Sequence, residues 1–158
     1  LIFGAATRVM SLRDGTKKMS KSDPSDLSRI NMTDDASAIS KKIRKAKSDA
    51  DILPDSQEGL KGRPEAANLM NIFAGLSDVD IKEVCQRYGG EQFSTFKKEL
   101  AELAVAKLAP IQDEMRLLMA DAEYIDSVLL NGTLRAQEIA EPVLDEVRKT
   151  VGFLKSMV

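Results

Sequence analysis

The chain contains no histidine among its 158 residues. Histidine is the usual general acid or base near neutral pH and a frequent zinc ligand. Its absence excludes a serine–histidine–aspartate triad, a histidine metal site and an imidazole acid–base pair from this chain. The one cysteine, Cys85, has no partner for an internal disulfide, which fits a reducing cytosol. We interpret Cys85 as a buried core thiol.

Long apolar runs are also absent. None approaches the roughly 20 residues of a membrane-spanning helix, and no signal peptide is recognisable. Hydrophobic residues make up 43% of the chain and charged residues 30%, which is typical of a globular domain. The net charge of −2 argues against a general coat for nucleic acid, but it allows a local basic face. Because the sequence opens at Leu1, we expect it to be part of a longer polypeptide.

Three lysines and two serines crowd into the stretch after Gly15, which reads Thr16-Lys17-Lys18-Met19-Ser20-Lys21-Ser22. Gly15 permits a tight turn, and Asp23 followed by Pro24 is typical of a helix N-cap and first helical position. We therefore predict a mobile loop just before a helix. Ammonium groups suit the moving oxygens of a polyphosphate and stabilise charge that develops there. The alternatives are a solvated loop, or a P-loop, for which Gly15-Thr16-Lys17 has the wrong order.

The stretch Lys18–Ser22 reads KMSKS, which is the second nucleotide-binding motif of class I aminoacyl-tRNA synthetases. The flanking runs Thr7–Leu12 and Asp14–Lys17 resemble those of bacterial-type tryptophanyl-tRNA synthetases. The run Pro64–Leu69 resembles that family too. The resemblance extends over essentially the whole chain, but it covers only the C-terminal half of the family's enzyme. Lys21 points to a bacterial or organellar source, because eukaryotic cytosolic tryptophanyl enzymes usually read KMSAS.

This resemblance implies an enzyme that activates tryptophan with ATP to tryptophanyl-adenylate and then transfers it to tRNA(Trp). ATP and Mg²⁺ are the implied cofactors, with no protein ligand identified for the metal. By the family pattern, Lys18 and Lys21 are catalytic and stabilise the transition-state phosphates. The implied ATP-binding residues are Val9, Lys18, Met19, Ser20, Lys21 and Ser22. The family is homodimeric, and the expected location is the bacterial cytoplasm, with an organellar matrix as the alternative and no membrane partner.

Class I synthetases also carry a HIGH-type motif with a histidine near the ATP phosphates. That motif cannot lie in a chain without histidine, so we expect this chain alone to be inactive. A tyrosyl-tRNA synthetase relative is one alternative, although the fully spelled KMSKS with its Gly-Thr-Lys lead argues against it. A non-catalytic helical module that binds RNA or protein is the other, and it would need neither Lys18 nor Lys21.

We predict a mainly α fold. Residues 1–33 would be the end of a Rossmann-like domain, with its last strand at Val9–Leu12 and the KMSKS loop, and its main part absent from this chain. Residues 34–158 would form an α-helical C-terminal domain, a bundle of the anticodon-binding type. Apolar spacing predicts six helical segments. They cover residues 35–47, 64–76, 78–88, a long helix from Glu91 that kinks or splits at Pro110, a short one around Ile125–Leu129 that stops at Asn131-Gly132, and a last one capped by Thr133.

Lys41, Arg44 and Lys45 share a face of the first predicted helix, away from the apolar stripe that contains Ile39 and Ile43. A helical face with three cations can follow a phosphate backbone, so we take these residues as candidates for tRNA binding. A solvated helix end is the other interpretation of the same charges.

Overall fold

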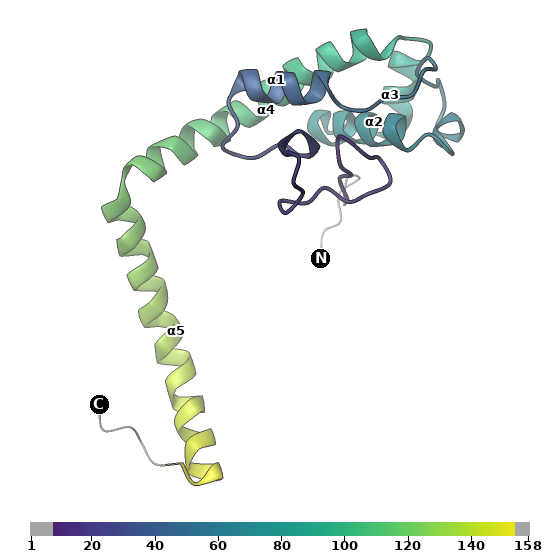
Figure 1. Ribbon diagram of the computed structural model, residues 1–158. Coiled ribbons are helices and arrows are strands. Elements are labelled where there is room, and N and C mark those ends of the chain that lie inside the picture. The colour runs from purple at the N-terminus through teal and green to yellow at the C-terminus, as the bar shows by residue number, and fades with distance from the viewer. Residues whose placement is uncertain (1–7, 154–158) are drawn as a thin grey trace. The chain divides into compact units, whose positions relative to one another are not determined.

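The structure is a computed structural model, and it describes residues 8–153 (Figure 1). Five α-helices dominate this part of the chain, which confirms the mainly α fold. The elements in chain order are η1 (Asp26–Ser28), α1 (Ala36–Arg44), η2 (Glu58–Leu60), α2 (Pro64–Ser77), α3 (Ile81–Tyr88), α4 (Phe93–Ala120) and α5 (Ala122–Val151), where η marks a 3₁₀ helix. None of these helices is both long and apolar enough to cross a membrane.

The described chain separates into two compact units, the first ending at Asp113 and the second beginning at Glu114. The boundary predicted between residues 33 and 34 is a different kind of division, and it stays a prediction. In the first unit, segments on both sides of that boundary share one hydrophobic core. Leu12 before it and Ile39 after it are both almost fully buried, at 2% and 0% exposed.

The predicted strand Val9–Leu12 does not form as a strand. Among residues 8–153, this segment makes one isolated antiparallel bridge, between Met10 and Lys18. A strand requires a ladder of backbone partners on its neighbours, and no neighbouring strand lies in the described part of the chain.

Helix α1 begins where the sequence predicts and ends earlier. The Asp35 carboxylate accepts a hydrogen bond from the Ala38 amide at 2.7 Å, as an N-cap does. The helix ends at Arg44 rather than near Lys47. The cause is tertiary, because the Lys47 amide donates to the Leu12 carbonyl at 2.7 Å instead of continuing the helix.

Three aromatic rings from α2, α3 and α4 form the centre of the first unit. Phe73 lies 5.0 Å from Tyr88 and 5.5 Å from Phe96, measured between ring centroids. Cys85 is fully buried, as predicted, and burial raises the pKa of its thiol. The helix predicted at 78–88 starts later, at Ile81: Ser77 is still the last residue of α2, and Asp80 caps α3.

The predicted helix end at Asn131-Gly132 is wrong, because α5 continues through both residues. Of the two outcomes predicted at Pro110, a kink or a split, the split does not occur, because α4 continues through Pro110. A mid-helix glycine costs only about 1 kcal/mol relative to alanine, whereas a break would sacrifice backbone hydrogen bonds on both sides. The short and last predicted segments are therefore one helix.

The apolar residues of α5 lie at core spacing, yet none of the residues of α5 is buried. Ile139 is 75% exposed and Val143 60% exposed. Leu154, predicted on the same stripe, lies outside the described residues. Helical spacing aligns apolar side chains on one face, but burial also needs a second element to cover that face.

Candidate nucleotide-binding loop

The predicted ATP-binding residues lie on one loop and on the segment that leads into it. Lys18 and Lys21 are exposed. Ser20 and Ser22 are exposed as well, and the Ser22 amide donates to the Ser20 hydroxyl at 3.2 Å. The two predicted catalytic ammonium groups are therefore free to meet an anionic ligand from solvent.

The structure brings Val9 and Met19 together, two of the residues that the resemblance implies in ATP binding. The Met19 amide donates to the Val9 carbonyl at 3.1 Å, and both side chains are partly buried. The Ser11 amide donates to the Lys17 carbonyl at 2.8 Å. These two bonds flank the bridge between Met10 and Lys18 and hold the first end of the loop.

A tight turn lies between the two halves of this bridge. The Asp14 carboxylate accepts hydrogen bonds from the Thr16 hydroxyl at 2.6 Å and from the Thr16 amide at 3.1 Å. These bonds lower the pKa of Asp14. Side chains of this kind that bond to the backbone two residues later stabilise turns. The turn thus precedes the lysines and directs them away from the core.

At the second end of the loop, the sequence predicts about two short helical turns from Pro24 to Arg29, and the structure has one. It is the three-residue 3₁₀ helix η1, which starts at Asp26. Asp23 does not cap it, because its carboxylate accepts the amide of Ser25 at 2.8 Å and forms a local turn. The Leu12 amide donates to the Ser28 carbonyl at 2.9 Å and ties the end of η1 to the first strand-like segment.

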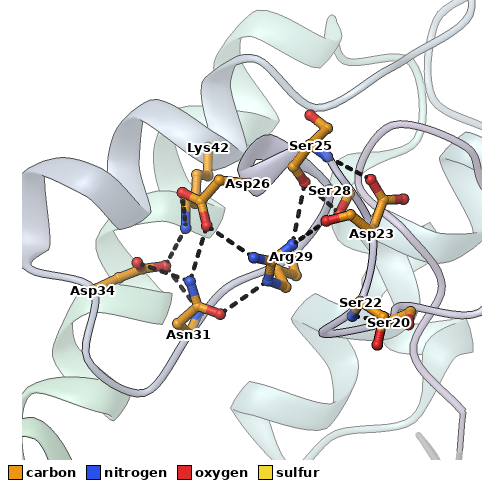
Figure 2. A network of polar contacts seen from close by, with 10 residues as sticks. All are labelled: Ser20, Ser22, Asp23, Ser25, Asp26, Ser28, Arg29, Asn31, Asp34 and Lys42. Carbon is orange, nitrogen blue, oxygen red and sulfur yellow. Dashed lines mark hydrogen bonds and ion pairs between the residues drawn. The ribbon is translucent and has the colours of Figure 1, made fainter.

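A buried lysine joins the segment after the loop to helix α1. Lys42 is 3% exposed, and its ammonium group lies 2.8 Å from Asp26 and 2.6 Å from Asp34. Figure 2 shows Lys42 between these two carboxylates. Burial by itself lowers the pKa of Lys42, but the hydrogen bonds to Asp26 and Asp34 together raise it above its ordinary value.

Arg29 extends this arrangement back toward the loop. Its guanidinium donates to the Asp23 carbonyl at 2.9 Å and to the Asn31 side chain at 3.1 Å (Figure 2). It also pairs with Asp26 at 3.4 Å. We call these connected side chains the Lys42 network; its members are Asp26, Arg29, Asn31, Asp34 and Lys42. The network fixes the backbone after Ser22 relative to α1.

In the sequence, Lys42 is one of several cations within the predicted helix 35–47, and neither its burial nor a role for Arg29 was predicted. A signal for Lys42 was available, because it follows Ile39 by three positions and precedes Ile43 directly. Helical spacing therefore places it at the edge of the buried stripe.

Three other cations lie at the C-terminal end of α1, and their exposure agrees with the prediction. Lys41, Arg44 and Lys45 are all exposed. The guanidinium of Arg13, at the start of the loop, donates to the Lys45 carbonyl at 2.8 Å. This contact adds a fourth cation beside the C-terminal end of α1. The role of this basic face in tRNA binding stays a prediction.

Helix α2 also contacts the segment that leads into the loop. Asn68 on α2 is 5% exposed, and its amide contacts the backbone of Met10 and Ser11. The sequence identified Pro64–Leu69 as a run that resembles the family and as the start of a helix, but it indicated no role for Asn68. Within residues 8–153, no three carboxylate, cysteine or histidine side chains gather closely enough to hold a metal ion.

The family model described as "tRNA synthetases class I (W and Y)" matches residues 2–109 of the chain. The chain belongs to this family. Curated relatives of this class I synthetase chain include proteins named tryptophan–tRNA ligase. The one from Agrobacterium fabrum is 61% identical over 98% of this chain, and the one from Rickettsia bellii is 43% identical over 98%. The chain spans 44% of the length of the first relative and 46% of the second.

A solved structure has the same fold. The tryptophanyl-tRNA synthetase from Mycoplasma pneumoniae aligns with a TM-score of 0.78 over 96% of this synthetase chain and 45% of its own length. Its sequence identity is 24%, so this likeness concerns the fold alone.

Proposed function

We propose that the protein containing this chain is a tryptophan–tRNA ligase and that this chain supplies its KMSKS loop. The reaction would join the tryptophan carboxylate to the α-phosphate of ATP with release of pyrophosphate, and then pass the tryptophanyl group to tRNA(Trp) with release of AMP. The observation that carries the proposal is the exposed pair Lys18 and Lys21 on a loop whose two ends are held by backbone hydrogen bonds. The high identity to relatives named tryptophan–tRNA ligase supports it.

In this proposal the two lysines act on charge rather than on protons. When the tryptophan carboxylate attacks the α-phosphate, negative charge develops on the phosphate oxygens and on the departing pyrophosphate. Lys18 and Lys21 stabilise that charge, which lowers the barrier because the cations are already in position. Val9 and Met19 border the adenine, and the Ser20 and Ser22 hydroxyls face the nucleotide. Mg²⁺ would accompany the ATP phosphates, and we assign it no ligand in this chain.

The basic face of α1 is our candidate contact with tRNA. Lys41 and Arg44 on α1 and Lys45 directly after it are exposed, and an exposed row of cations is the surface that a phosphate backbone binds. The complete enzyme would be a homodimer, as in the family that the sequence resembles. The bacterial cytoplasm is the location we propose, because the named relatives are bacterial and both ATP and tRNA occur there.

The test measures tryptophan-dependent exchange between ATP and pyrophosphate in the full-length gene product. Lys18→Ala and Lys21→Ala should each lower the exchange rate by roughly 100-fold or more, with little change in tryptophan affinity. Lys82→Ala is the matched control, because Lys82 is an exposed lysine on α3 outside the loop. Unchanged exchange in both loop variants would contradict the catalytic role and favour a non-catalytic helical module.

The same assay distinguishes the tyrosyl alternative. Exchange that depends on tryptophan and not on tyrosine supports the proposal, and the opposite preference overturns it.

A further inference from the structure

The backbone of Met10 has an unusual pairing. In its antiparallel bridge to Lys18, the connecting hydrogen bonds come from the neighbours, Met19 to Val9 and Ser11 to Lys17. The N–H and C=O of Met10 itself therefore point away from the loop, as they do at every second position of a strand. In a sheet these two groups would pair with the next strand.

The side chain of Asn68 occupies the position of that missing strand. Its Oδ1 accepts the Met10 amide at 3.0 Å, and its Nδ2 donates to the Met10 carbonyl at 3.0 Å. The same Nδ2 also donates to the Ser11 carbonyl at 3.2 Å. A carboxamide has the same donor and acceptor as a peptide group, so it can complete both bonds at once.

Asn68 is well suited to hold this backbone still. It is 5% exposed and stands on α2 beside Leu69 and Met70, which are 1% and 0% exposed. Because its neighbours are fixed in the core, the amide has little freedom to move. A buried polar group that loses its partner carries a cost of about 1–3 kcal/mol, which favours the bonded arrangement.

The first turn of α2 contacts the same region at two more points. A Cβ at Gly15 would lie 2.5 Å from the Pro64 carbonyl carbon, so the turn before the lysines touches the helix backbone closely. The Glu65 carboxylate pairs with Lys47 at 2.7 Å, and this hydrogen bond lowers the pKa of Glu65. The Lys47 amide in turn donates to the Leu12 carbonyl.

We propose that Asn68 is a positioning residue that replaces a neighbouring β-strand along Met10 and Ser11 and so fixes the first end of the KMSKS loop. This inference rests on the proposed function for its kinetic consequence. Asn68 lies outside the loop, and it would act through the backbone that carries Lys18 and Lys21. A displacement of about 1 Å at a positioning residue can cost roughly 100-fold in rate.

The first test measures hydrogen–deuterium exchange in the full-length gene product. Asn68→Leu keeps a similar volume and removes all three hydrogen bonds, so amides in peptides covering residues 9–19 should exchange at least roughly 10-fold faster. Asn71→Leu is the matched control, since Asn71 is an exposed asparagine on the same helix that bonds only to the Ala67 carbonyl. Equal exchange in the Asn68 variant and the control would overturn the proposal.

The second test separates positioning from a general structural role. In ATP–pyrophosphate exchange, Asn68→Leu should lower kcat by roughly 10- to 100-fold and leave the KM for tryptophan within about twofold. If Asn68→Leu does not fold, Asn68→Asp serves instead, because it keeps the shape and the acceptor for the Met10 amide while losing both donations. A parallel loss of kcat and tryptophan affinity would indicate a structural role only and would overturn the proposal.

The two proposals fail in different ways. If Lys18→Ala leaves pyrophosphate exchange unchanged, the proposed function fails, while the deuterium experiment still judges the contact made by Asn68. If the lysine variants lose exchange and the Asn68 variants match Asn71→Leu in both tests, only the inference about Asn68 fails.

Discussion

Neighbouring lysines in this chain differ in burial, although nothing in their residue type distinguishes them. Lys41 and Lys45 are exposed, whereas Lys42 between them is buried against two carboxylates. Lys97 on α4 is buried too, and it donates to the Ala46 carbonyl at 2.6 Å and to the Ser48 hydroxyl at 3.1 Å. Burial lowers the pKa of Lys97. Lys97 thereby fixes backbone just after the C-terminal end of α1, whereas Lys42 ties α1 to Asp26 and Asp34, which precede the helix.

Replacing Lys42 should destabilise the first unit. Lys42→Met keeps the buried stem but leaves the nearly buried Asp34 without its cation, which should lower the free energy of unfolding by roughly 2 kcal/mol. Urea unfolding followed by circular dichroism measures this, with Lys41→Met on the exposed face as the control. An equal effect of the two substitutions would show that the Lys42 network contributes nothing.

The ion pairs of Lys42 also predict that the stability of the first unit depends on pH. The pKa of Lys42 is raised above its ordinary value of 10.5, so the folded state binds its proton more tightly than the unfolded state. Its contribution is therefore fully present below pH 10.5 and is lost as the pH rises through the raised pKa. The wild type and Lys42→Met should converge in stability in that alkaline range.

Among the helices, α5 contains a sequence pattern that is typical of a helix end but does not end the helix. Asn131-Gly132 is typical of a helix end, yet it lies inside an unbroken helix. Apart from its chain neighbours and the backbone of its own helix, a Cβ at Gly132 would meet no atom within 4 Å, and Gly132 lacks the positive φ that a C-cap glycine adopts. The residue behaves as an interior helical position.

Gly132→Ala should therefore stabilise α5 by about 0.5–1 kcal/mol, because alanine loses less backbone entropy in a helix. Gly152→Ala is the contrasting variant, since Gly152 follows α5 with a φ of 77°, where a side chain is strained. Thermal unfolding followed by circular dichroism should show a gain for the first variant and a loss for the second. A loss at Gly132 would mean that the helix does break there.

At the scale of the whole molecule, the basic face of α1 gives a prediction about salt. Neutralising Lys41, Arg44 and Lys45 together should weaken tRNA(Trp) binding by the full-length gene product. Each lost phosphate contact reduces the slope of log affinity against log salt by about 0.7–0.9, so three contacts reduce it by roughly 2 to 3. Filter binding at several salt concentrations measures both quantities.

A variant with the same change in net charge separates contact from general attraction. Lys82, Lys98 and Lys107 are exposed lysines on α3 and α4. Their joint replacement by alanine should leave the slope near the wild-type value. If both triple variants lower it equally, the face of α1 has no special part in binding.

Much of the local structure follows from residues that are close together in the chain. The Asp35 cap, the start of α2 at Pro64 and the buried Ile39 and Ile43 follow from side-chain chemistry and spacing within a few residues. The KMSKS run likewise marked the candidate loop, because the charges it needs are adjacent in the chain.

The way in which that loop is held depends on contacts between residues far apart in the chain. The contact of Asn68 with Met10 spans 58 positions, and the pairing of Lys42 with Asp26 depends on how η1 packs beside α1. The predicted strand is reduced to a single bridge because no second strand lies beside it in the described part of the chain. The apolar face of α5 is exposed because no other described element covers it. Propensity and spacing describe a segment with its near neighbours, whereas burial and pairing are set by partners distant in the chain.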